Sequence, residues 1–280
     1  MTFPDFDPVL LQIGPFALRW YALAYIGGIG LGWWWGRRLA DPRLWGAAGP
    51  PINKTQVDDF VLWVALGIIL GGRIGYMLFY QPSRLAGNPL ELFKIWEGGM
   101  SFHGGFLGVV IATVIFSLKN KVDMLRLGDM VAPCVPFGLL FGRLANFVNA
   151  ELWGRPTDAP WGVVFCNERL LQVYRGACPA GLLPRHPSQL YEAALEGVAL
   201  FLILFWATHV AKLLPRRGTT TGLFLIGYAV FRTIVETMRE PDATVFFGVL
   251  TTGQALSLPM LLVGLWLVIR GKPAPSPQAA

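Results

Sequence analysis

The stretch GRLANFVNAELWGR, Gly142–Arg155, decides the fold because it puts polar side chains at the end of an apolar run. The run before it covers about residues 127–148 and is long enough to cross a bilayer. Lipid offers no hydrogen bonds to an arginine, two asparagines and a glutamate, so each must face protein, water or a polar ligand. We therefore expect a membrane scaffold that brings further polar groups to this stretch.

The amino-acid composition is that of a polytopic membrane protein. Hydrophobic residues make up 54% of the 280 residues and charged residues only 14%, with a mean hydropathy of +0.51. A soluble domain carries about 25% charged residues, and the deficit here is spread along the whole chain. The net charge of +6 does not indicate nucleic-acid binding, because the basic residues lie in short loops where they set membrane topology. The first residues carry no basic group, so we expect no cleavable signal peptide.

Seven apolar runs predict an all-α polytopic membrane protein with about seven transmembrane helices. The runs cover approximately residues 16–35, 60–80, 100–118, 127–148, 190–210, 221–238 and 254–269. Basic residues follow the first, third, fifth and seventh runs, so the positive-inside rule places the N-terminus in the periplasm and the C-terminus in the cytoplasm.

The segments outside these runs complete the predicted domain organisation. Residues 1–270 would form a single transmembrane domain. The polar loop at about 149–187 would be a small periplasmic cap between helices 4 and 5, with a short strand at 161–165. Residues 271–280 are rich in Pro and Ala and are expected to be a disordered cytoplasmic tail.

The three cysteines have no metal-ligand spacing. Cys134 lies in an apolar run and is expected to pack there. Cys166 and Cys178 share the cap loop, where they form a disulfide if the loop faces an oxidising compartment, or remain free thiols. The sequence contains no zinc-binding helix motif, nucleophile elbow, P-loop or acidic cluster for magnesium. We expect neither a metal nor a cofactor.

Two groups of polar residues inside the predicted spans are candidates for chemistry. Arg143, Asn146 and Asn149 recur every three residues and share one side of a helix. The second group forms a polar stripe on an otherwise apolar helix. It consists of Tyr228, Arg232, Glu236 and Arg239. A polar network between helices, or an Arg232–Glu236 ion pair, is the structural alternative, but that pair leaves a second cation over.

His103 and Arg73 extend the predicted site. His103 stands between glycine pairs near the outer end of the third run, and a histidine serves as a general base near neutral pH. Residues 185–192, RHPSQLYE, suit the start of a helix, so capping and packing are favoured over chemistry there. The arginines at 73, 143, 232 and 239 make the site cationic, and arginine forks match phosphate oxygens. A cationic membrane site under an external cap indicates an anionic phospholipid as ligand.

The chain resembles the bacterial prolipoprotein diacylglyceryl transferase family. Residues 142–154 match the signature GRx(A/G)NFxNxExxG, and the resemblance extends over nearly the whole chain. It also includes FPxFDP at 3–8, GGRIGY at 71–76, and the segments 98–105, 186–192 and 227–242. The resemblance implies a seven-span enzyme of the cytoplasmic membrane that uses no metal or cofactor. Such enzymes transfer the diacylglyceryl group of phosphatidylglycerol to the lipobox cysteine in the signal peptide of a prolipoprotein and release glycerol-1-phosphate.

The resemblance and the polar pattern together give the expected site. The catalytic candidates are His103, Arg143, Tyr228 and Arg232. The candidates for substrate binding are Tyr21, Arg73, Asn146, Glu151, Gly154, Glu236 and Arg239. His103 would take the proton of the substrate thiol; alternatively, the arginines lower the thiol pKa and His103 only positions lipid. Arg143 and Arg232 would hold the phosphate and stabilise the charge that develops on it.

Two other classes of function remain at this point. A transporter or flippase for an anionic lipid would use the same pocket, but it usually has internal repeats or broken helices. The chain has no repeat and only weak helix breaks, at Pro133 and Pro136. A structural membrane scaffold does not explain several unpaired intramembrane cations.

Overall fold

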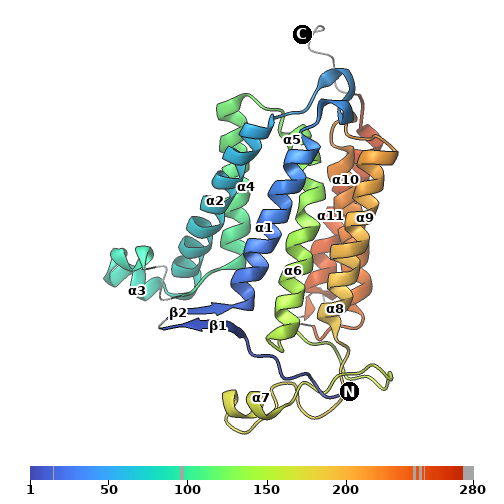
Figure 1. Cartoon of the computed structure of the whole chain (residues 1–280). Helices are drawn as coiled ribbons and strands as arrows, with labels where there is room; N and C mark the ends of the chain where they lie inside the picture. The colour runs from blue at the N-terminus through green and yellow to red at the C-terminus, as the bar shows by residue number, and fades with distance from the viewer. Residues whose placement is uncertain (15, 95–97, 242–243, 246–247, 249, 274–280) are drawn as a thin grey trace.

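The computed structural model describes all residues except 15, 95–97, 242–243, 246–247, 249 and 274–280. Most of the predicted tail at 271–280 therefore lies outside the described residues. The described chain is mainly helical, and its longer helices run side by side as a bundle (Figure 1). The N-terminus lies at one end of this bundle, and α11, the last helix along the chain, runs within it (Figure 1).

Each predicted apolar run contains a helical segment of the bundle. The segments are α1 (Trp20–Leu39), α2 (Lys54–Tyr80), α4 (Phe102–Asn120), α5 (Met124–Val131) with α6 (Val135–Val148), α8 (Ser188–Glu192) with α9 (Leu200–Phe205), α10 (Thr219–Glu236) and α11 (Thr252–Arg270). A 3-10 turn, Ala132–Cys134, joins α5 to α6, and prolines lie at the starts of both this turn and α6. Two π-helical segments, Ala193–Ala199 and Trp206–Val210, flank α9.

Five of these segments, in the described part of the chain, are long and apolar enough to cross a membrane. They are Lys54–Tyr80, Phe102–Asn120, Met124–Val148, Ser188–Val210 and Thr252–Arg270. The prediction of a polytopic membrane protein is confirmed at this level. The other two long helices are less apolar, because α1 is rich in Trp and Gly and α10 carries threonines and an Arg–Glu pair.

The first helix begins later than expected, since residues 16–19 are not helical. They form β2 (Phe16–Arg19), which pairs antiparallel with β1 (Val9–Ile13). A second small hairpin, β3 (Thr244–Val245) with β4 (Leu250–Thr251), precedes α11. The all-α expectation therefore holds for the bundle, with two short sheets outside it.

The loop at 149–187 has a small apolar core of its own at the N-terminal end of the bundle. The loop contains α7 (Glu168–Val173). Its Phe165 is buried in this core together with Phe3 from the start of the chain. Cys166 and Cys178 are disulfide-bonded, with their Cα atoms 5.1 Å apart, which resolves the alternative that the sequence left open. The strand predicted at 161–165 is wrong, because its residues form only isolated bridges, such as Val163 with Arg185.

Backbone contact between glycines joins α2 to α4. A Cβ atom at Gly71 would lie 2.4 Å from the carbonyl oxygen of Gly104, and one at Gly108 would lie 2.0 Å from that of Gly67. Small residues permit this approach of membrane helices. Two further packings, α1 on α6 and α6 on the α8–α9 segment, carry the polar residues described next.

Candidate active site

Glu192 lies at the centre of an arginine cluster inside the bundle. Its carboxylate is fully buried and contacts three guanidinium groups. Oε2 lies 3.3 Å from Nε of Arg143, and Oε1 accepts hydrogen bonds from Arg232 and, at 3.2 Å, from Arg239. Arg143 comes from α6, Arg232 from α10 and Arg239 from the residues after α10, so one carboxylate of α8 ties these segments together.

Two further buried glutamates accompany these arginines. Glu236 lies 3.0 Å from Arg232, one helical turn away on α10. Glu196 is fully buried in the π-helical segment, 3.9 Å from Arg143, and neither of its oxygens has a hydrogen-bond partner. We call Arg143, Arg232 and Arg239, together with Glu192, Glu196 and Glu236, the Arg–Glu cluster.

The local structure explains why these side chains meet. The predicted stripe on α10 is confirmed for Arg232 and Glu236, which are both buried and paired. Arg239 follows directly after this helix and reaches the same carboxylate. Tyr228 is partly buried on α10, within electrostatic reach of Glu196 and Arg143. A π-helical turn starts directly after Glu192, and such turns are frequent at functional sites.

The expectation of surplus cations is wrong for the described cluster. Its three arginines face three glutamates, so each cation has a carboxylate within 4 Å. Glu192 was expected to serve in capping and packing, and the structure gives it the central ionic role. The signal for it was in the sequence, because carboxylates at 192 and 196 inside an apolar run are as costly in a membrane as the arginines.

A second group of polar residues, from α1 and the end of α6, consists of Tyr21, Asn146 and Glu151. The Asn146 amide donates to the Tyr21 hydroxyl and, at 2.9 Å, to Oε1 of Glu151. Partial burial raises the pKa of the Glu151 carboxyl. Asn146 and Glu151, both candidates for substrate binding, are thus joined by a direct hydrogen bond, and Tyr21 joins them from a distant part of the chain.

Gly154 is buried where the cap meets the ends of α8 and α10. Its N–H donates to the carbonyl of His186 at 2.9 Å, and a Cβ atom at this position would lie 2.6 Å from the carbonyl oxygen of Met238. Any side chain here would push the cap away from the bundle. Its observed contacts are those of a packing residue, and its role in substrate binding stays a prediction.

Arg73 lies apart from the Arg–Glu cluster, on α2. Its guanidinium donates to the backbone carbonyls of Glu91 at 2.6 Å and Leu92 at 3.2 Å, and also to that of Gly98. These bonds organise the loop that follows α3 (Pro82–Gly87). The structure thus does not bring Arg73 to the other predicted arginines, and its role in substrate binding stays a prediction.

His103 is also not brought to the cluster. It is exposed in the first turn of α4, and its ring contacts that of Phe102. Among the described residues it has neither a hydrogen bond nor an ion pair. Its helix packs on α2, whereas the arginines lie on α6 and α10. The sequence did not show that His103 lies on a helix apart from those that carry the arginines.

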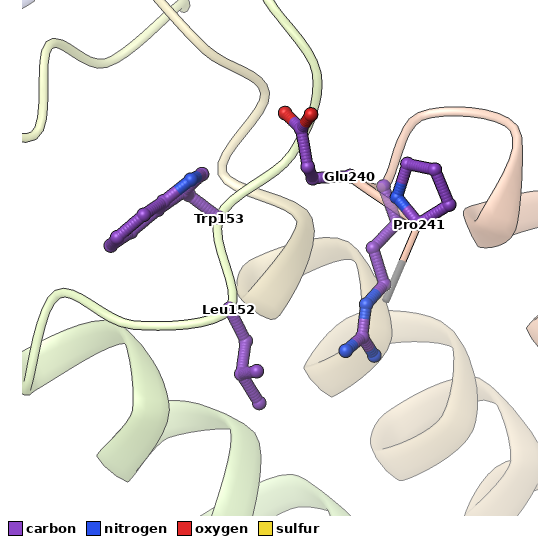
Figure 2. A pocket seen from close by; sticks show the side chains of 5 residues that line it. Leu152, Trp153, Glu240 and Pro241 are labelled. Atoms are coloured by element: carbon purple, nitrogen blue, oxygen red, sulfur yellow. The ribbon is translucent and has the colours of Figure 1, made fainter. Parts of the chain in front are cut away.

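A pocket of about 310 Å³ opens where the cap meets the end of α10. Figure 2 shows Leu152 and Trp153 on one side of it and Glu240 and Pro241 on the other. Arg239 also lines the pocket. The pocket thus reaches a member of the Arg–Glu cluster from outside. Within the described residues, no group of three or more His, Cys, Asp or Glu side chains could hold a metal ion.

Comparison with known proteins gives the family. The family model of prolipoprotein diacylglyceryl transferase matches residues 8–270. This chain belongs to the prolipoprotein diacylglyceryl transferase family. It is similar to the phosphatidylglycerol–prolipoprotein diacylglyceryl transferase of Phenylobacterium zucineum, with 60% identity over 100% of this chain and 97% of the relative. The protein of the same name from Caulobacter sp. strain K31 is 56% identical over 100% of this chain and 98% of the relative. The one from Agrobacterium fabrum is 49% identical over 98% of this chain and 95% of the relative.

Membership in the diacylglyceryl transferase family makes the chain a transferase and a multi-pass membrane protein. The family model covers α1 to α11, so both the Arg–Glu cluster and the Tyr21–Asn146–Glu151 group lie inside the matched region. The sequence resemblance is thus confirmed over the full bundle.

Proposed function

We propose that this transferase moves the diacylglyceryl group of phosphatidylglycerol to the thiol of a lipobox cysteine in a prolipoprotein signal peptide. This is the first step of bacterial lipoprotein maturation. A C–S bond forms at the glycerol carbon of the diacylglyceryl group, and the bond from that carbon to the phosphate oxygen breaks. The thiol loses its proton, and glycerol-1-phosphate leaves. The nucleophile comes from the substrate, so the chain's own cysteines need not react.

The convergence of three arginines on one buried carboxylate carries this proposal. Guanidinium groups that share one carboxylate are arranged to bind an anion from several sides, and the same forks match phosphate oxygens. The phosphodiester gains negative charge as it becomes a monoester. Arg143 and Arg232 would stabilise that charge in a water-poor site, where electrostatic interactions are strong. Arg239 would hold the same phosphate from the side of the pocket.

We propose that Tyr21, Asn146 and Glu151 bind the glycerol headgroup. They offer hydroxyl, amide and carboxyl groups that pair with hydroxyl groups. Asn146 stands on α6, one turn beyond Arg143, so a headgroup bound there would keep its phosphate near the Arg–Glu cluster. Glu236 and Tyr228 would orient Arg232 and Arg143, and Gly154 would fix the cap above them.

The activation of the substrate thiol has two candidate versions. The exposed ring of His103 is open to a substrate, and it would serve as the base if the peptide thiol binds between α4 and the arginines. In the second version, the arginines lower the thiol pKa and His103 positions lipid. Phosphate binding by the arginines is part of both versions.

We further propose seven membrane spans, formed by the five apolar segments together with α1 and α10. At 1.5 Å per residue, the 20 residues of α1 and the 18 of α10 reach about 30 and 27 Å, near the thickness of a bilayer core. Both helices run alongside the others (Figure 1). The tryptophans of α1 and the Arg232–Glu236 pair of α10 lower the hydropathy of these helices without preventing a span inside the bundle.

The orientation we propose has the cap and the N-terminus in the periplasm, the C-terminus in the cytoplasm, and the bundle in the inner membrane. Basic residues gather at the end opposite the cap; examples in the last turns of helices are Arg37, Arg38, Lys119 and Arg270. The cap contains the disulfide, and disulfides persist in oxidising compartments. A periplasmic cap is also where a lipobox peptide is accessible.

A direct assay tests the proposed reaction. The purified protein is mixed with phosphatidylglycerol and a lipobox peptide, and the peptide mass is measured. We expect a gain of one diacylglyceryl unit, and a reduction of about 10²–10³-fold in turnover for Arg143→Ala in folded, inserted protein. Absence of the adduct, with lipid movement between leaflets, would favour a transporter. Unchanged turnover of the variant would rule out the role of Arg143.

A further inference from the structure

Glu192 occupies the place that the proposed reaction gives to a phosphate group. It has no exposed surface, and its two oxygens contact Arg143, Arg232 and Arg239. The side chains of these arginines are 17%, 10% and 6% exposed, so solvent screens the contacts weakly. Without a ligand, the arginines are therefore neutralised from within the protein.

A phosphate that binds these arginines must compete with this carboxylate. The apparent affinity of a ligand falls with the fraction of the protein in which its site is free. The leaving glycerol-1-phosphate carries more negative charge than the phosphodiester it comes from, and charge strengthens its contacts with guanidinium groups. Tight product binding would slow turnover, and a carboxylate that returns to the arginines would oppose it.

We propose that Glu192 is an internal counter-anion, which competes with the phosphate of substrate and product for the three arginines. It thereby promotes release of glycerol-1-phosphate. This inference rests on the proposed function. Glu196 supports the exchange. It lies 3.9 Å from Arg143, and its oxygens have no hydrogen-bond partner. Arg143 thus has a second carboxylate to contact while the phosphate and Glu192 change places. In this role Glu192 is a positioning residue, because it acts on the substrate through the arginines.

The variant Glu192→Gln tests this competition. It keeps the size and polarity of the side chain and removes its charge. We expect the inhibition constant of glycerol-1-phosphate to fall about tenfold, the KM for phosphatidylglycerol to fall, and kcat to fall because the product leaves slowly. A side chain that only holds the arginines in place would give the opposite split, with a higher KM and a higher inhibition constant. An unchanged or raised inhibition constant in folded protein would overturn the proposal.

Asp129→Asn is the matched control. Asp129 is another fully buried carboxylate, and it accepts hydrogen bonds from the backbone N–H groups of Gly218 and Thr221 at the opposite end of α10. Its loss should lower thermal stability while the inhibition constant stays that of the wild type. The effect of Glu192→Gln on anion binding would then not be a general consequence of losing a buried charge.

Two further measurements keep the test decisive. If Glu192→Gln does not fold, Glu192→Asp retains the charge but reaches the arginines less well, and we expect a smaller fall of the inhibition constant; no fall would contradict the competition. Calorimetric binding of glycerol-1-phosphate to wild type and variant measures the competition without turnover. Tighter binding by the variant would support the counter-anion even if no peptide adduct formed, whereas a missing wild-type adduct alone would reject the proposed reaction.

Discussion

At the scale of single residues, the polar groups of the predicted spans find their partners on other helices. Polarity inside an apolar run singled out Arg143, Asn146 and Arg232, because lipid cannot satisfy such groups. The pairing of Arg143 with Glu192 could not be predicted, since it depends on how two separate helices rotate against each other. The partners of Arg73 could not be predicted either, because its guanidinium donates to backbone carbonyls, which leave no mark in the sequence.

The variant His103→Gln distinguishes the two versions of thiol activation. If His103 is the general base, the variant should lose about 10²–10⁴-fold in rate at saturating substrate, because that is the usual contribution of such a group. The rates of the variant and the wild type are compared from pH 6 to 9. A near-normal rate of purified His103→Gln over this range would leave the arginine field as the means of thiol activation.

Glu151 gives the site a pH dependence with a definite sign. Burial raises the pKa of its carboxyl in the folded protein, so the folded state binds its proton more tightly than the unfolded state. The stabilising effect is full below the unfolded pKa of about 4.3 and is lost as the pH rises through the folded value. Thermal unfolding of Glu151→Gln should lack this decline. Equal pH slopes for the variant and the wild type would contradict the assignment.

At the scale of helices and strands, apolar runs were sufficient to find every long helix but not its ends. The start of the first helix was misplaced because Phe16–Arg19 form a strand that pairs with β1. A short apolar run without a clear periodicity is compatible with a helix as well as with a strand. The π-helical turn after Glu192 was also unpredictable, since it reflects packing of the whole span. The glycines of α2 that contact α4 are four residues apart, at positions 67, 71 and 75, but their packing role was not predicted.

Gly71→Ala tests the contact between α2 and α4. The added methyl group would lie 2.4 Å from the carbonyl oxygen of Gly104, so the helices must separate, and overpacking of this kind costs about 1–3 kcal/mol. We expect a lower thermal midpoint in detergent. Gly30→Ala on α1 is the control, because a methyl group there meets no atom within 4 Å. A destabilisation of equal size in both variants would show that helix packing is not its cause.

At the scale of the whole molecule, the cap is a small body joined to the bundle by hydrogen bonds and by aromatic packing on Phe147 of α6. Its apolar core includes Phe3 from the far N-terminus, and Arg155 donates to the carbonyl of Arg239 at 2.9 Å. The existence of a polar loop was predictable from composition, whereas its core was not, because it is assembled from two distant parts of the chain.

The disulfide should matter most for this cap. Cys166 and Cys178 are 12 residues apart, and closing a loop of about this length stabilises a fold by roughly 3 kcal/mol in the chain-entropy model. The double variant Cys166→Ser/Cys178→Ser should lose activity at a lower temperature than the wild type, while the bundle keeps its helical circular dichroism. Cys134→Ser, in the bundle, serves as the control. Identical inactivation temperatures would show that the cap does not depend on the bond.

The distribution of the Arg–Glu cluster over the chain also constrains how the protein is made. Arg232 and Glu236 lie one turn apart, so α10 carries its own neutralising partner when it leaves the translocon. Arg143 and Glu192 lie on successive spans and pair across them. Each would face lipid as a bare charge if its helix entered alone. Residues 124–210 are therefore expected to enter the bilayer as one cooperative unit during synthesis, and the later pairing of Glu192 with Arg232 and Arg239 would record that α10 has docked.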